Sequence, residues 1–250
     1  KNDARGTAKT QNITIGSSGS PASLTVNSVG HSYAKADIIQ PASLGLITLS
    51  LNVLYAYANG TFEALAGFAA GTSYLNQLSV SADYATYAEA YTGAGTLNVA
   101  AASVAVNVAY AETGTVVNVG LDGGTLRYTG SADLTLSADG SGKAFAGVRA
   151  AVISLSGVQI AANVVIAKLT AEQNVFIIDT DLTTSGNVSI LSTYNKNSTS
   201  AKSTPCGAVA AITSPDLSAT FYGLQINSAT ANTDAKVRAF TPASTITANQ

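Results

Sequence analysis

Two short stretches of this chain, Leu78-Ser-Val-Ser-Ala-Asp83 and Leu134-Thr-Leu-Ser-Ala-Asp139, are almost the same, and their spacing decides the fold. Related stretches begin at Leu24 (Leu-Thr-Val) and at Val188 (Val-Ser-Ile-Leu-Ser). The four first residues are 54, 56 and 54 positions apart, which indicates about four units of about 55 residues. A repeat of this length is typical of architectures in which each unit packs only against its neighbours.

Inside each unit, apolar and polar residues alternate, as in Ile47–Val53 and Val104–Ala109. This period of two is the signature of a β-strand, and helical spacing is nowhere sustained. Glycine-containing dipeptides interrupt the alternation and are typical of turns between strands. They occur at Gly19, Asn59-Gly60, Gly123 and Asp139-Gly140. The chain is therefore expected to be all-β.

The repeat favours a parallel β-helix (β-solenoid) over a sandwich or barrel, because small residues suit the narrow interior of stacked coils. Two coils per unit would give an elongated single domain over residues 1–250 with about 9 rungs. The residues that start the units, near Leu24, Leu78, Leu134 and Val188, should then occupy matching positions along one axis, about 10 Å apart. A strand core is expected at Val104, Val106, Val108, Ile153, Leu155, Val164 and Ile166.

Charge and cysteine content exclude several classes of protein. Only 10% of residues are charged, and 12 Lys+Arg stand against 14 Asp+Glu without a basic stripe, which argues against nucleic acid as a partner. Cys206 is the only cysteine, so an intrachain disulfide and a cysteine-based zinc cluster are excluded. The most apolar stretch, Asn98–Ala111, is too short for a transmembrane helix, and we expect no membrane insertion. The strand-like end and the missing initiator Met suggest a fragment of a longer chain.

The stretches Thr96–Thr113, Val117–Gly124 and Leu134–Asp139 are similar to the Ala/Val-rich repeats of the leukotoxin-like filamentous adhesins. These are very large bacterial exoproteins, related in style to filamentous haemagglutinin. The resemblance covers about residues 75 to 190 and lies in the texture of the repeat. It implies a right-handed β-helix exported to the cell surface, which acts as a stalk or an adhesive face. The family offers no catalytic motif to transfer to this chain.

Four features of the sequence could carry chemistry. Asp179-Thr-Asp181 places two carboxylates on one face of a strand, as glycoside cleavage would require, but a strand end at a turn explains it as well. Asp139-Gly-Ser-Gly-Lys143 resembles the opening segment of pectin methylesterases, and a tight turn is the simpler interpretation. His31 is the only histidine. Asp122-Gly-Gly is only a fragment of a calcium-binding nonapeptide. We therefore predict no enzyme, no cofactor and no metal.

Tyrosines offer the only candidate binding surface. Tyr84, Tyr87 and Tyr91 are clustered, and exposed tyrosines suit adhesion because each combines a broad apolar ring with a polar tip. Stacking of tyrosines between coils is the alternative interpretation. The expected partner is a host or bacterial surface glycan or protein.

These observations predict a structural or adhesive segment of a secreted bacterial surface protein, located outside the cell. One alternative is a subunit of an extracellular filament that self-associates by strand complementation at exposed sheet edges. A further alternative is a β-helical carbohydrate-active enzyme.

Overall fold

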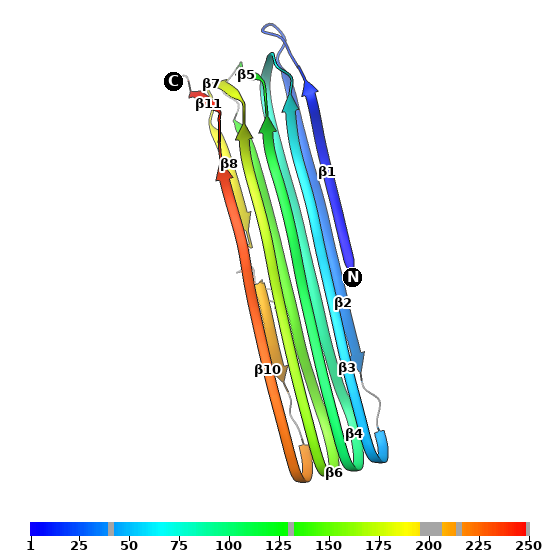
Figure 1. Cartoon of the computed structure of the whole chain (residues 1–250). Helices are drawn as coiled ribbons and strands as arrows, with labels where there is room; N and C mark the ends of the chain where they lie inside the picture. Colours follow the sequence, from blue (N-terminus) through cyan, green and yellow to red (C-terminus); the bar gives the residue numbers. More distant parts are fainter. Residues whose placement is uncertain (40–42, 130–132, 196–206, 214–216, 249–250) are drawn as a thin grey trace.

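The chain is a parallel β-solenoid in which very long strands stack side by side (Figure 1). The computed structural model describes residues 1–39, 43–129, 133–195, 207–213 and 217–248, without the side chains of residues 39, 43, 93–98, 149–154, 217–219 and 248. No helix occurs in these ranges. The strands are β1 (Asn2–Ile13), β2 (Ala22–Ile39), β3 (Ser43–Phe68), β4 (Thr72–Asp122), β5 (Thr125–Tyr128), β6 (Leu134–Ile178), β7 (Asp181–Thr184), β8 (Val188–Tyr194), β9 (Gly207–Thr213), β10 (Leu217–Phe240) and β11 (Thr245–Ala248).

Each turn of the solenoid is a flattened loop in which the chain runs down one side, bends at the lower end and runs back up the other side (Figure 1). β4 pairs with β2 through residues 75–93 and with β3 through residues 98–122, so one strand serves both sides of the loop. We call the two sides the descending layer (β2, the first parts of β4 and β6, β8 and β9) and the ascending layer (β1, β3, the second parts of β4 and β6, and β10). The short strands β5, β7 and β11 close the upper end.

The four repeated residues lie side by side in the descending layer. Leu24 pairs with Leu78, Leu78 with Leu134, and Leu134 with Val188. One unit therefore makes one turn, and successive equivalents occupy adjacent strands about 4.8 Å apart. The expected two coils per unit, and with them the 9 rungs and the 10 Å spacing, are wrong. The long dimension follows the strands: the part of β3 after the lower bend, from Ile47 to Phe68, spans about 70 Å at about 3.3 Å per residue.

The rung count was overestimated because two of the four expected turns are strand interiors. Gly60 lies inside β3 and Gly140 inside β6. A Cβ atom would lie 2.4 Å from Cε2 of Phe62 at the first position and 2.1 Å from Cζ of Tyr84 at the second. The absent side chains make room for two buried rings, which stack with their centroids 5.4 Å apart. The whole segment Asp139–Lys143 is likewise extended, not a tight turn.

Gly123 does form a turn, as expected. Gly123 and Gly124 both have φ of +78°, at the corner between β4 and β5. One turn further along, Asp179 adopts the left-handed conformation, with φ of +50°, at the corner between β6 and β7. The Gly123 amide donates to the Ile178 carbonyl over 3.0 Å, which ties the two corners together. The pair Asp179 and Asp181 thus lies at the end of a strand.

The interior changes character from the upper to the lower end. Near β5 and β7 it holds large side chains such as Phe62, Leu121 and Leu182. Further down, the two layers face each other almost entirely through alanines. These alanines are Ala34, Ala56, Ala58, Ala88, Ala90, Ala109, Ala111, Ala144, Ala146, Ala167 and Ala171. Because a buried alanine fills little space, close packing of the two layers there needs few larger side chains, and among the described residues the buried cluster contains only Val148, Val165 and Leu169 besides the alanines.

Below the alanines the expected core is inverted. Val104, Val106, Val108, Val164 and Ile166 are partly exposed, and Leu155 is exposed. Their polar neighbours in sequence, Ser103, Asn107, Ser156 and Asn163, are buried instead. The side chain of Ile153 lies outside the described residues. The period-2 pattern was thus interpreted correctly as strand, but its two faces were assigned the wrong way round.

Candidate functional site

The three tyrosines of the predicted adhesive surface do not share one surface. Tyr84 is buried between the layers against Phe62, so this part of the prediction is wrong. Its burial raises the pKa of the phenol far above the ordinary value. Tyr87 and Tyr91 are half-buried on the outer side of the descending layer. The Tyr91 ring stacks on Phe145 at 4.7 Å between centroids, so stacking between turns, the alternative interpretation, describes this residue.

An ion pair lies beside the two tyrosines: Lys143 is in the row of Tyr87, and Glu89 is in the row between Tyr87 and Tyr91. Nζ of Lys143 is 2.9 Å from Oε1 of Glu89, and Lys143 is only 4% exposed. The Tyr33 hydroxyl donates to Oε2 of Glu89 over 3.3 Å. Both oxygens of the carboxylate are therefore engaged by groups of neighbouring strands. This arrangement crosslinks the descending layer and leaves little free hydrogen-bonding capacity around the two tyrosines.

A groove of about 410 Å³ lies on the opposite side, on the outer surface of the ascending layer. It crosses β3, β4, β6 and β10, and Gly114 lies in its middle row between Asn59 and Thr170. A Cβ atom at Gly114 would lie 2.7 Å from Oδ1 of Asn59, so the missing side chain creates the hollow. Oδ1 of Asn59 is buried there without a hydrogen-bond partner. The other residues of the groove are Tyr57, Gly60, Thr61, Glu112, Thr115, Val116, Ala171, Glu172, Asp234 and Lys236.

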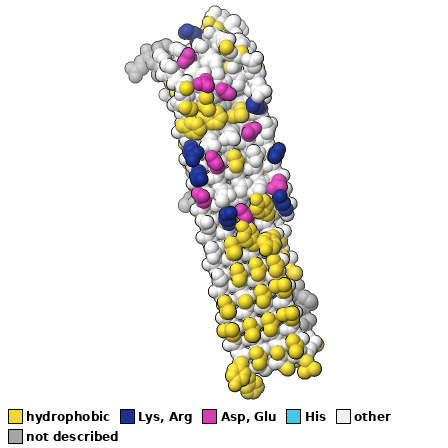
Figure 2. All heavy atoms as spheres, viewed as in Figure 1, with side chains coloured by type: hydrophobic (Ala, Val, Ile, Leu, Met, Phe, Trp, Pro, Cys, Tyr) yellow, Lys and Arg dark blue, Asp and Glu magenta, His cyan; other side chains and the backbone are white. Residues whose placement is uncertain are grey.

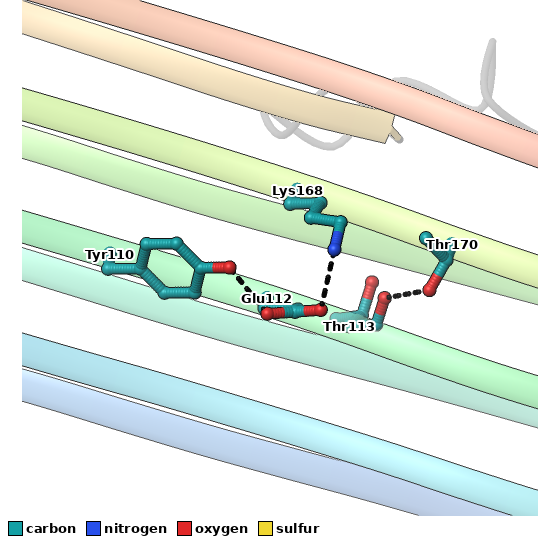
Figure 3. A network of polar contacts seen from close by, with 5 residues as sticks. All are labelled: Tyr110, Glu112, Thr113, Lys168 and Thr170. Carbon is teal, nitrogen blue, oxygen red and sulfur yellow. Dashed lines mark hydrogen bonds and ion pairs between the residues drawn. The ribbon is translucent and has the colours of Figure 1, made fainter.

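One wall of this groove is a network of polar contacts (Figure 3). Nζ of Lys168 lies 3.2 Å from Oε1 of Glu112, and the Tyr110 hydroxyl donates to Oε2 of the same carboxylate. In the next rows toward the upper end, Oγ1 of Thr170 donates to the Thr113 carbonyl over 3.2 Å. The hydrogen bond to Glu112, with partial burial, raises the pKa of Tyr110 to about 12. The Glu112 carboxylate is thus held in one orientation at the edge of the groove.

The second groove carboxylate is also paired. Oε1 of Glu172 lies 3.6 Å from Nη1 of Arg238 and accepts a hydrogen bond from Nδ2 of Asn174 over 3.5 Å. Three carboxylates (Glu112, Glu172 and Asp234), an amide oxygen, threonine hydroxyls and the Tyr57 ring therefore converge on one open surface. Groups of this kind can hydrogen-bond a hydroxyl-rich ligand and pack against its apolar side.

The groove could not be predicted from the sequence of a single unit. Its residues come from four different units, since its middle row across β3, β4, β6 and β10 consists of Asn59, Gly114, Thr170 and Asp234. Superposing the units by their offset of about 55 residues would have placed Glu112 beside Lys168. No signal within one unit indicates a site.

The other candidates give no further site. His31 is exposed on β2. Cys206 lies outside the described residues. Among the residues that the structure describes, no group of three or more His, Cys, Asp or Glu side chains is placed to hold a metal ion. The described ranges also contain no helix with the length and hydropathy of a bilayer-crossing segment.

Comparison with known proteins adds no identity: no family model, no curated protein and no solved structure matches this chain.

Proposed function

We propose that this chain is a structural and adhesive segment of a secreted bacterial surface protein, a stalk or adhesin passenger that acts outside the cell. The observation that carries the proposal is the unbroken register of the long strands. β4 and β6 pair almost continuously from Leu78 with Leu134 to Asp122 with Ile178. Each unit thus adds one strand to each layer without changing the cross-section, as a stalk built from repeats requires.

The similarity of the repeats to those of leukotoxin-like filamentous adhesins supports the same role. The groove around Gly114 would supply the adhesive part, and we propose a surface glycan or a protein as its ligand. We assign the chain no reaction, because Lys168 and Arg238 pair with Glu112 and Glu172, two of the three carboxylates in the groove, and Asp234 is the third. A pair of carboxylates that act as acid and base would be needed for glycoside cleavage.

Adhesion can be tested by filling the groove. The purified chain is applied to an array of immobilised neutral and acidic oligosaccharides and to fibronectin and collagen surfaces. We expect binding to at least one surface, and a loss of about tenfold or more for Gly114→Leu. Gly19→Leu is the control, because no atom lies within 4 Å of a Cβ atom at Gly19. If no surface is bound, or if Gly114→Leu binds as the unmodified chain does, the groove is not an adhesive site.

A second candidate, the subunit of an extracellular filament, is favoured by the edge strand β10. Among the described residues, β10 is paired along its length only with β6. Its described side chains from Phe221 to Phe240 are all exposed, including Ala229 and Ala231, whose partners Val165 and Ala167 are buried. An unpaired edge of this length is a template for another strand.

Electron microscopy and light scattering over a concentration series test the filament. We expect filaments that disappear when Ala229→Lys and Ala231→Lys are combined, because inward-pointing charges block edge pairing. Asn232→Lys, on the outer surface of the same strand, is the control. A chain that never polymerises leaves the stalk as the proposed role.

A further inference from the structure

The lower half of the ascending layer carries an apolar surface on its outer side (Figure 2). The register places aliphatic and aromatic side chains in rows across four strands. The rows are Ile47-Ala102-Val158-Tyr222, Leu49-Val104-Ile160-Leu224, Leu51-Val106-Ala162-Ile226, Val53-Val108-Val164-Ser228 and Tyr55-Tyr110-Ile166-Thr230. We call this surface the apolar outer face. It is well exposed at its first strand, where Leu49 is 78% and Leu51 69% exposed.

The interior directly behind this surface is polar. Nδ2 of Asn52 donates to Oδ1 of Asn107 over 2.7 Å, and the same contact continues to Asn163 and Asn227 over 2.9 Å at each step. A sheet with one face in water normally places its apolar side chains inward and its polar side chains toward water. The arrangement is reversed here. The buried amides are satisfied because their hydrogen bonds run from turn to turn, and the apolar side chains lie outside.

The apolar outer face has a sharp upper border. The next row along the strands contains Glu112 and Lys168, and the charged belt continues upward through Glu172, Lys236 and Arg238. No charged residue occurs in the five rows themselves. Exposed apolar surface that is continuous over several hundred Å² and edged by polar residues marks an interaction site.

We propose that the apolar outer face binds the same face of a second copy of this chain, giving a dimer in which two ascending layers pack sheet against sheet. Four strands at about 4.8 Å and ten residues at about 3.3 Å give about 600 Å² for each copy, or about 1,200 Å² in the pair. This area lies within the range of specific protein interfaces. Flat rows of aliphatic side chains can interdigitate with a second set related by a twofold axis.

Electrostatics permits this partner. The formal net charge of the chain is −2, so two copies repel each other little. The charged belt above the face carries both signs, with Glu112 beside Lys168 and Glu172 beside Arg238. The belts of two paired copies would therefore not repel each other strongly. A strongly charged partner would find nothing complementary in the five rows. A second copy supplies an uncharged flat surface of equal size.

The test is the mass of the full chain by light scattering coupled to size exclusion, from about 1 to 100 µM. We expect a dimer for the unmodified chain and a dissociation constant at least about tenfold higher for Leu51→Lys combined with Ile160→Lys. The control is Thr61→Lys combined with Val116→Lys, which adds the same charge to the same layer outside the rows; Val116 and Ile160 are both 40% exposed. Circular dichroism should show that all variants keep their β-structure, because these side chains point outward.

Three results would overturn the proposal. The first is a monomer for the unmodified chain at every concentration, and the second is a dimer of equal strength in the Leu51→Lys, Ile160→Lys variant. The third is a monomer that sediments with phosphatidylcholine vesicles through this face, which would identify lipid as the occupant. Ala229→Lys with Ala231→Lys blocks only the edge of β10, so this variant should still dimerise. Failure of the filament and failure of the dimer are thereby distinguished.

Discussion

Asn107 accepts a hydrogen bond from Asn52 and donates one to Asn163, so that it links three successive turns inside the solenoid. Its side chain is buried, and both of its polar atoms are engaged. In the lower half the ladder lies in the interior beside small side chains and a few larger ones such as Leu54 and Val165. The stability of the lower half should therefore depend on polar pairing in addition to apolar packing.

Replacing Asn107 with alanine should destabilise the fold by about 2–4 kcal/mol, since the amides of Asn52 and Asn163 each lose a buried partner. Unfolding in urea, followed by circular dichroism, measures this loss. Asn227→Ala is the matched control, because Asn227 is the exposed end of the same ladder and its loss removes a partner from one buried amide, that of Asn163, instead of two, so it should cost about half as much. Equal costs at the two positions would argue against a buried ladder.

Aspartate placed on either face of the second half of β4 tests the inverted core. Val106→Asp should lower the melting temperature only slightly, because this side chain lies on the outer side. Ala109→Asp places an unpaired carboxylate in the alanine-lined interior, at a cost of several kcal/mol, and should yield insoluble or unfolded protein. Soluble yield and thermal melting distinguish the two variants. The opposite ranking would mean that the valines form the core.

Gly140 should tolerate no side chain while Tyr84 is present. A Cβ atom there meets the phenol ring at 2.1 Å, and overpacking of this kind costs about 1–3 kcal/mol. Gly140→Ala should lower the free energy of unfolding by this amount, whereas Gly19→Ala should leave it unchanged, because its surroundings are open. Combining Gly140→Ala with Tyr84→Ala removes the clash, so the two costs should be less than additive. Additive costs would show that the ring and the glycine do not interact.

The Tyr110–Glu112 contact should make the free energy of unfolding depend on pH in the alkaline range. The folded pKa of Tyr110 is about 12, against an ordinary value of 10.0, so the native state holds this proton more tightly than the unfolded state. The contribution is fully present below about pH 10 and is lost as pH rises to about 12. Denaturation at pH 9 and pH 11.5 should show a loss that is smaller in Tyr110→Phe. Phenolate absorbance of Glu112→Gln should reveal one tyrosine that titrates at lower pH; an unchanged titration would contradict the contact.

Chelation should leave the melting temperature within about one degree of its untreated value, since we expect no bound metal to stabilise the native state. Thermal melts with and without EDTA, followed by readdition of calcium, test this expectation. A drop of about ten degrees or more that calcium reverses would reveal a structural metal.

Two properties of this protein follow from its sequence alone, the strand conformation and the length of the repeat, because each is visible in short stretches of residues. Alternation along Ile47–Val53 and Val104–Ala109 requires extended chain, since only a strand turns successive side chains to opposite sides. The match between Leu78–Asp83 and Leu134–Asp139 sets the period, and these stretches do lie side by side in register. A parallel stack of strands follows from these two facts.

Tertiary structure decided where the chain turns and which face of each strand is inside. The dipeptides Asn59-Gly60 and Asp139-Gly140 are typical of turns, yet both glycines lie inside strands. They leave the space that the rings of Phe62 and Tyr84 occupy. Alternation likewise defines two faces without saying which is buried. Asn107 is inside and Val106 outside, and the buried amide is satisfied because it finds partners along the stack of turns. The groove at Gly114 depends on four units at once, so only the assembled layer creates it.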